Sequence, residues 1–398
     1  MSDTRDPFLQ LLREARLAGA SDLILSAGSP PSIYQGGRLQ PLAREPLPAA
    51  RLHEVIRGAL DEAQRQRLEQ QRDLDFSLAD TGLGRCRVNV HYQRQSLAAA
   101  VRFVPNMIPT LSELGLSEHL GQLVELTRGL VLVTGGTGSG KSTTLAALLD
   151  RVNHSRAAHI ITLEDPIEYS FTNDRSIVEQ REIGEDAPSF ASALRHVVRQ
   201  KPDVILIGEM RDLETIATAL TAAETGHLVL ASLHTITAAQ TVERIVDVFD
   251  ARQQAQVRVQ LANTLRAIVC QTLLPSTQAP APREGKPATS PQDFSRTTGL
   301  VPALEILIAT PAIRRAIRDG ETHLIPGMIE TGSKWGMRTL DASLADHVRE
   351  GRVQRAEALA LAADPEKLER LVGAPPMAKP VERMPVPTTS TGPRKPWE

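Results

Sequence analysis

One run of residues has the composition of a phosphate-binding loop. Residues 135–143 contain the pattern G-x-x-x-x-G-K-S, after the apolar run LVLVT and before the helical pattern STTLAALLD. Glycines permit the turn, and the backbone N–H groups of such a loop face anionic phosphates. We therefore expect a nucleotide to bind at Gly135, Gly136, Thr137, Gly138, Ser139, Gly140, Lys141, Ser142 and Thr143.

Two side chains of this loop have separate expected roles. The Lys141 ammonium is expected to reach the β- and γ-phosphates, and the Ser142 hydroxyl is expected to bind Mg²⁺. The expected ligands are thus ATP and Mg²⁺. A chance glycine-rich turn is the alternative, and the coincidence of strand, loop, Lys-Ser pair and helix disfavours it.

Hydrolysis requires carboxylates near the γ-phosphate, and two apolar runs end in acidic residues. Val204–Ile207 resembles a Walker B strand and leads to Gly208, where an Asp commonly stands in such strands, and then to Glu209. The second run, Ile160–Leu163, leads to Glu164, Asp165 and Glu168. Open α/β sheets place ligands at the carboxyl ends of their strands, so one of these three acids could orient or deprotonate the attacking water. A solvated strand end is the alternative for either acidic cluster alone.

Two histidines bracket the next apolar strand. His227 and His234 are seven residues apart, so an unbroken strand would direct them to opposite faces. The strand-end position makes His234 a candidate sensor of the γ-phosphate. His227 is as well explained by a structural role.

Four arginines are candidates for contacts with phosphate. Arg195 and Arg199 are four apart on a helix expected over 190–199, and Arg87 and Arg102 lie on the polar face of an expected hairpin. A solubilising role is the alternative for each one. If they converge on the nucleotide, they neutralise charge on the transferring phosphoryl group.

The elements that position these residues divide the chain near Pro105 and Pro109. Residues 1–109 predict an α+β domain, with a helix, a strand and a β-hairpin at 7–20, 23–25 and about 83–104. In 110–372 apolar strands alternate with helices, which predicts an α/β domain with a parallel sheet covered on both faces. Helical patterns continue to 372. Two proline-rich segments, 276–298 and 373–398, are predicted to be a disordered insertion and a disordered tail.

Composition limits the classes of function. The 398 residues carry 45 Lys and Arg against 47 Asp and Glu, and only 3% are aromatic, which disfavours nucleic acid as a partner. Two distant cysteines, Cys86 and Cys270, predict neither a disulfide framework nor a zinc site. No long apolar run or signal peptide is evident, so we expect a soluble, intracellular protein.

Four segments together resemble the secretion-superfamily ATPases. GGTGSGKSTTLAALLD, ITLEDPIEYS, DVILIGEMRDLETI and TAAETGHLVLASLHT are similar, in that order, to the Walker A motif, Asp box, Walker B motif and His box of that family. The resemblance is greatest to the PilT-type retraction ATPases of type IV pili and covers most of residues 7–372. SDLILSAGSPPSI, GRCRVNV, TPAIRRAIRDG and GMRTLDASL extend it.

The resemblance implies a PAS-like N-terminal domain joined to a RecA-like P-loop ATPase domain. It implies a homo-hexamer on the cytoplasmic side of the inner membrane that hydrolyses ATP, acts on a membrane platform protein and so extracts pilin. It also implies that Glu168 and Glu209 are the hydrolytic acids, and that residues 312–319 serve retraction but not hydrolysis. The arginines that it places at the phosphates are Arg87, Arg102, Arg195 and Arg199.

The chain departs from the family pattern at a few places, and other functions stay open. Gly136 replaces a usual proline, and neither proline-rich segment has a recognised counterpart. The lack of a tetracysteine zinc cluster favours retraction over pilus assembly or type II secretion. A PilU-like accessory ATPase, a nucleic-acid translocase, and a regulatory subunit that binds ATP with little turnover are the remaining alternatives.

Overall fold

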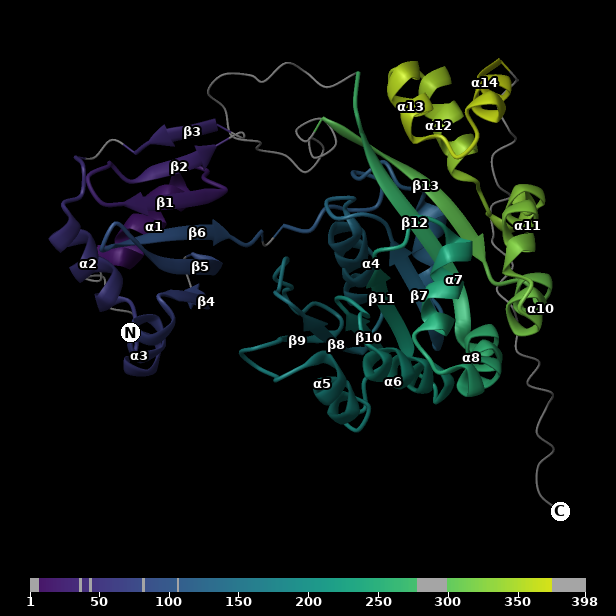
Figure 1. The fold of residues 1–398 in the computed structure, drawn as a ribbon, viewed down its shortest axis with the longest axis horizontal. Coiled ribbons are helices and arrows are strands. Elements are labelled where there is room, and N and C mark those ends of the chain that lie inside the picture. Colours follow the sequence, from purple (N-terminus) through teal and green to yellow (C-terminus); the bar gives the residue numbers. More distant parts are fainter. Residues whose placement is uncertain are drawn as a thin grey trace. The chain divides into compact units, whose positions relative to one another are not determined.

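The computed structural model describes residues 7–35, 38–42, 45–80, 83–105, 107–277 and 299–373. The chain forms two compact units (Figure 1). The first contains the described residues up to Met107 together with Ile167–Phe171, and the second contains the other described residues of the sheet and helices that follow. The predicted tail beyond Gly373 and residues 278–298 of the predicted insertion lie outside the described residues.

The first unit is built on a six-stranded antiparallel sheet. The strand order is β3-β2-β1-β6-β5-β4. Its helices are α1 (Pro7–Leu17), α2 (Ala49–Gly58) and α3 (Glu62–Gln71). The strands are β1 (Asp22–Ser26), β2 (Ser32–Gln35), β3 (Arg38–Pro41), β4 (Asp73–Asp80), β5 (Gly84–Gln93) and β6 (Ser96–Phe103).

One face of this sheet carries the core of the unit. Buried side chains of β1, β5 and β6, such as Leu23, Val88 and Val101, pack with the apolar sides of α1 and α2. The opposite face is more polar, because alternate residues of a strand point to opposite sides. The predicted hairpin is confirmed as β5 and β6, and Arg87 lies directly opposite Arg102 in their register. The α+β class follows, whereas the PAS-like relationship stays a prediction.

The second unit contains a seven-stranded sheet in the order β13-β12-β7-β11-β10-β8-β9. All neighbouring pairs are parallel except β12 with β13. Every residue of β7, β10 and β11 is buried, so both faces of the central sheet are covered. The strands are β7 (Gly129–Thr134), β8 (His159–Glu164), β9 (Ile177–Glu182), β10 (Val204–Ile207), β11 (Leu228–Leu233), β12 (Leu265–Pro275) and β13 (Leu300–Ile308).

Helices connect and flank these strands. Helix α6 packs against α5 and α8, and α12 and α13 pack against the paired strands β12 and β13 (Figure 1). They are η1 (Glu118–Val124), α4 (Lys141–Ser155), α5 (Phe190–Val197), α6 (Leu213–Glu224), α7 (Ala238–Asp247), α8 (Ala251–Thr264), α10 (Pro311–Asp319), η3 (Thr322–Leu324), α11 (Ile325–Thr331), η4 (Ser333–Trp335), α12 (Leu340–Arg349), α13 (Arg355–Leu361) and α14 (Pro365–Gly373).

The predicted α/β class with a parallel sheet is confirmed, and three strands of the sheet were not predicted. The four predicted apolar strands are β7, β8, β10 and β11. Strand β9 extends the sheet beside β8, and the β12–β13 hairpin extends it beside β7. The strand β7 that leads into the glycine-rich loop is therefore internal, with β11 on one side and β12 on the other.

Candidate active site

The glycine-rich loop joins the end of β7 to the start of α4. Gly135, Gly138 and Gly140 have φ angles of 147°, 78° and 83°, which other residues rarely adopt. The N–H of Gly135 donates to the carbonyl of Leu233 at the end of β11 (3.3 Å), and Gly140 is the N-cap of α4. The sequence thus places a positive helix end directly behind the loop, as anion binding requires.

The side chain of Lys141 turns back into the loop. It is 9% exposed, and its Nζ donates to the carbonyl oxygens of Gly135 (3.0 Å) and Gly136 (2.9 Å). The nearby Ser139 hydroxyl is buried and has no hydrogen-bond partner among the described residues. A buried ammonium beside an unpartnered hydroxyl inside a loop of backbone amides fits a polyphosphate.

The departure at Gly136 is sterically mild. A Cβ atom at this position would meet no heavy atom within 4 Å, whereas a Cβ at Gly135 would lie 2.2 Å from the carbonyl oxygen of Gln271. The first glycine of the loop is thus required by close packing, and the second is not.

Glu209 follows β10 and is held by two basic side chains. Its Oε1 accepts from Arg211 Nε at 2.6 Å and lies 2.9 Å from His234 Nε2, and its side chain is 17% exposed. Burial acts to raise the pKa of Glu209, but the hydrogen bonds from Arg211 and His234 outweigh it and lower the pKa below its ordinary value. Glu209 is therefore held as a carboxylate.

Neighbouring strands fix the backbone around Glu209. Gly208 N–H donates to Leu163 O of β8 (2.7 Å), and Met210 N–H donates to Ser232 O of β11 (3.1 Å). A Cβ at Gly208 would lie 3.1 Å from Leu163 O and 3.3 Å from the Cα of Glu164. The glycine in place of the usual Asp thus allows the ends of β8 and β10 to approach closely.

The two histidines lie outside the strand that they bracket, so the alternation argument for an unbroken strand does not apply. His227 precedes β11, and its Nδ1 lies 3.0 Å from the carbonyl oxygen of Ala222, which is a structural contact. His234 follows the strand and contacts Glu209. The structure therefore brings together one histidine and one acid of the expected set.

The acids at the end of β8 and beyond it are in different surroundings. Glu164 Oε1 accepts from Thr162 Oγ1 (2.6 Å) and Gln180 Nε2 (3.1 Å), so hydrogen bonds orient this carboxylate. Glu168 belongs to Ile167–Phe171, which clusters with the first unit, where the Ser170 N–H donates to the carbonyl of Pro105 (3.2 Å). The approach of Glu168 to the nucleotide loop stays a prediction.

The four arginines are divided between the units. In the first unit Arg102 Nε donates to Asp22 at 2.8 Å, next to Arg87 across the strand pair. In the second unit Arg195 pairs with Glu214 of α6 at the surface. The expected helix over 190–199 ends at Val197, so Arg199 lies in the following turn. Their convergence on phosphate stays a prediction.

The sequence motifs did not identify two further side chains near these residues, the buried Gln271 and the half-buried Glu305. Gln271 of β12 donates to the carbonyl of Ser139 in the loop at 2.7 Å. Glu305 of β13 accepts from the N–H of Ala238 at the start of α7 (2.7 Å), just after the His234 loop. Both lie on strands whose apolar patterns gave no functional signal.

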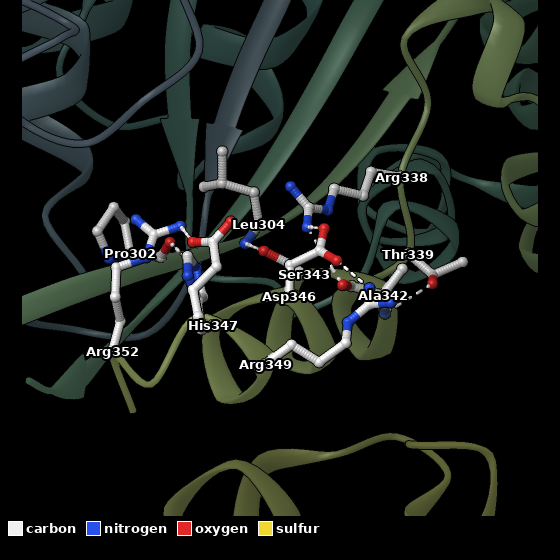
Figure 2. A network of polar contacts seen from close by, with 11 residues as sticks. Pro302, Leu304, Arg338, Thr339, Ala342, Ser343, Asp346, His347, Arg349 and Arg352 are labelled. Carbon is white, nitrogen blue, oxygen red and sulfur yellow. Dashed lines mark hydrogen bonds and ion pairs between the residues drawn. The ribbon is translucent and has the colours of Figure 1, made fainter. Parts of the chain in front are cut away.

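The segment GMRTLDASL and the rest of α12 form a separate polar network that fastens α12 to β13 (Figure 2). Asp346 pairs with Arg338 and Arg349, and the Ser343 hydroxyl accepts from the N–H of Leu304 (3.1 Å). His347 Nε2 donates to the carbonyl of Pro302 at 2.9 Å. Arg338 and Ser343 of the C-terminal signature thus contribute to the packing of α12 on β13.

Other features of the described residues concern metal binding, cysteines and membrane insertion. In the described ranges no group of three or more His, Cys, Asp and Glu side chains could hold a metal ion. Cys86 and Cys270 are buried and free. No helix within the part of the chain that the structure describes is long and apolar enough to cross a bilayer.

A sheet of parallel strands, with the glycine-rich loop after β7 and acids after β8 and β10, defines a RecA-like P-loop ATPase. The family model described as "Type II/IV secretion system protein" matches residues 64–360. The chain belongs to this family.

Individual relatives match nearly the whole chain. The type IV pilus retraction ATPase PilT of Pseudomonas aeruginosa is 43% identical over 357 residues, which cover 90% of this chain and 98% of PilT. The type IV pilus ATPase PilU of the same organism is 39% identical over 365 residues, covering 92% of this chain and 91% of PilU. A crystal structure of the pilus retraction motor PilT with bound ADP matches with a TM-score of 0.80 and 42% identity, covering 91% of this chain and 98% of the other.

Proposed function

We propose that this protein is a hexameric ATPase motor that powers retraction of a type IV pilus and thereby twitching motility. The observation that carries the proposal is the 43% identity with PilT, which extends over 98% of that relative rather than over the nucleotide loop alone. The ADP-bound structure of similar fold supports the Walker A loop as the nucleotide site. The motor would act at the cytoplasmic face of the inner membrane, on a platform protein and through it on pilin.

The residues of the loop supply the binding part of the mechanism. The backbone amides from Thr137 to Ser142 would receive the phosphates, and Lys141 would exchange its contacts with Gly135 and Gly136 for contacts with the β- and γ-phosphates. Ser142, on the first turn of α4, is the residue that would hold Mg²⁺. The metal would neutralise phosphate charge during transfer.

The acids and basic residues supply the chemical part. Glu168 would take the proton of the attacking water, while Glu209, held charged by Arg211 and His234, would orient the water or the metal shell. Glu164, whose orientation Thr162 and Gln180 fix, is the alternative base. Charge on the transferred phosphoryl group would be neutralised by Arg87, Arg102, Arg195 and Arg199, in their own subunit or a neighbour.

The nucleotide would lie next to a junction between domains or subunits, and contacts with the γ-phosphate from both sides would hold this junction closed. Loss of the γ-phosphate would then open it. Such a change converts a local electrostatic event into domain rotation. In a ring of subunits, successive openings would turn the platform protein and draw pilin from the base of the fibre.

Deletion of the gene tests the biological proposal directly. Excess surface fibres with lost movement are the expected result, because pilin extraction stops while assembly continues. Absent fibres would instead identify an assembly or secretion ATPase. A deletion strain that twitches normally, but fails when a paralogous motor is impaired, would indicate the accessory role suggested by the similarity to PilU.

Steady-state ATP hydrolysis tests the enzymatic proposal. Wild type should hydrolyse ATP, Lys141→Ala should lose ATP binding, and Glu168→Gln should bind ATP without turnover. Glu209→Ala should lose turnover and retain binding. Equal, negligible hydrolysis by wild type, Lys141→Ala and Glu209→Ala would instead support a nucleotide-gated regulatory subunit.

A further inference from the structure

The buried side-chain amide of Gln271 contacts the Walker A loop. This residue has no role in the mechanism proposed above. Gln271 on β12 is 6% exposed, and its Nε2 donates to the carbonyl oxygen of Ser139 at 2.7 Å. Its Oε1 accepts from the Thr144 hydroxyl at 2.8 Å. Because the Ser139 carbonyl can only accept, the NH₂ group must face it, and Thr144 must donate to the remaining oxygen.

The same residue also touches both ends of the loop. A Cβ atom at Gly135 would lie 2.2 Å from the backbone oxygen of Gln271, and a Cβ at Gly140 would lie 2.8 Å from its Nε2. The backbone of β12 therefore requires glycine at position 135, whereas at Gly140 the φ angle of 83° favours glycine and the side chain of Gln271 lies close by. The Walker A loop thus packs against Gln271 of the adjacent strand β12.

We propose that Gln271 is a positioning residue that holds the Walker A loop in its phosphate-binding conformation. The carbonyl of Ser139 and the N–H of Gly140 belong to one planar trans peptide and point in opposite directions. By holding the Ser139 carbonyl toward β12, Gln271 directs the Gly140 N–H to the other side of that peptide. The hydrogen bond from Thr144 connects the side-chain amide of Gln271 to the first turn of α4.

This arrangement orders the loop before ligand arrives, which lowers the cost of binding. The inference rests on the proposed function only in taking ATP as the ligand. Since the hydrolytic acids follow β8 and β10 rather than β12, loss of the amide should weaken ATP binding more than it slows the chemical step.

Gln271→Met tests the amide because methionine keeps the length of the side chain and removes both hydrogen bonds. We expect the KM for ATP to rise about tenfold or more, as for a buried carbonyl left unsatisfied, while kcat at saturating ATP stays within about threefold of wild type. Gln260→Met on α8, where the amide contacts Glu224 near the surface at 3.4 Å, is the matched control and should keep the wild-type KM. An unchanged KM in Gln271→Met would overturn the proposal.

Thr144 provides a second route if Gln271→Met folds poorly. Thr144→Val removes the hydroxyl donor at nearly constant volume, whereas Thr144→Ser retains it. The KM should rise in the valine variant and stay closer to wild type in the serine variant. Since both residues belong to one network, the effects of Gln271→Met and Thr144→Val should be less than additive. Equal KM values for the valine and serine variants would count against the amide contact.

Hydrogen exchange of the nucleotide-free protein separates this inference from the proposed function. The amides of residues 138–143 should exchange about tenfold faster in Gln271→Met than in wild type, with the central strand β11 unchanged. Equal exchange rates at the loop would refute the positioning role even if ATP hydrolysis is normal. A wild-type protein that does not bind ATP would refute the proposed function, while the exchange rates would still decide the role of Gln271.

Discussion

At the residue scale, the protonation state of Glu209 depends on hydrogen-bonding side chains that lie outside the strand before it. Burial alone would raise its pKa, and the contacts with Arg211 and His234 reverse the direction. The apolar run Val204–Ile207 predicted an acid at the sheet edge, because carboxyl ends of parallel strands meet there. The contact with His234 depends on where β11 ends, which the sequence alone left open.

A pH profile of hydrolysis tests this arrangement. Wild-type Glu209 stays ionised at pH values below the ordinary glutamate pKa of 4.5. The fall in kcat/KM that its protonation causes, the acid limb of the profile, should therefore occur below that pH. His234→Ala removes one of the opposing contacts and leaves burial, so the acid limb should move to higher pH. Arg211→Ala should do the same, because the hydrogen bond and the charge of Arg211 also lower the pKa of Glu209. An acid limb at the same pH in all three proteins would contradict this account of Glu209.

At the element scale, the strands that could be predicted differ from those that could not by their local context. The runs that became β7, β8, β10 and β11 are short and apolar and are followed by loops, so they read as buried parallel strands. Strand β12 follows α8 without a break, and an apolar run that continues a helix is ambiguous between helix and strand. Its partner β13 lies beyond residues 276–298, so the pairing is long-range. Gln271 was missed for this reason.

Glu305 of β13 is predicted to stabilise the start of α7. Glu305→Leu leaves the N–H of Ala238 without its acceptor and should lower the free energy of unfolding by about 1–3 kcal/mol. Glu305→Gln keeps an acceptor oxygen and removes the half-buried charge, so it should be much less destabilising. Denaturant unfolding of both variants checks this, and equal losses would show that the acceptor is not the stabilising feature.

His347 of α12 should make stability depend on pH. Burial, followed by the nearby charge of Arg352, lowers the pKa of His347 to about 4, against an ordinary 6.5. Between these values the unfolded chain binds a proton that the native protein does not. The free energy of unfolding should therefore fall as pH drops from 6.5 toward 4, by on the order of 3 kcal/mol in total.

His347→Gln supplies the control for this titration. Glutamine has an N–H that can donate to the carbonyl of Pro302 and does not titrate, so this part of the pH dependence should vanish. The measurement is denaturant unfolding of both proteins at pH 7 and pH 4.5, at one protein concentration. The same loss of stability in wild type and His347→Gln would exclude His347 as its source.

At the scale of the whole molecule, α10 separates residues that fold the protein from residues that could transmit motion. Helix α10 follows β13 through Thr310, which caps it, and packs on α8. Ile317 is fully buried, whereas Arg315 and Arg318 are exposed. The family resemblance grouped 312–319 as one functional helix. The structure divides that helix into an apolar side for packing and a basic side that is free of the core.

This division changes how the role of α10 in retraction should be tested. Ile317→Ala should destabilise the protein by about 2–5 kcal/mol, because it leaves a cavity in the core, and lost motility in that variant would carry no information about force transmission. Arg318→Ala removes an exposed charge and should leave ATP hydrolysis and thermal stability at wild-type levels. If the basic side of α10 contacts the platform protein, Arg318→Ala should still abolish twitching and leave fibres on the surface. Arg315→Ala, whose lost contact with Asp319 is a surface ion pair within the helix, gives the comparison at equal charge. Normal twitching in both arginine variants would remove α10 from the path between hydrolysis and the fibre.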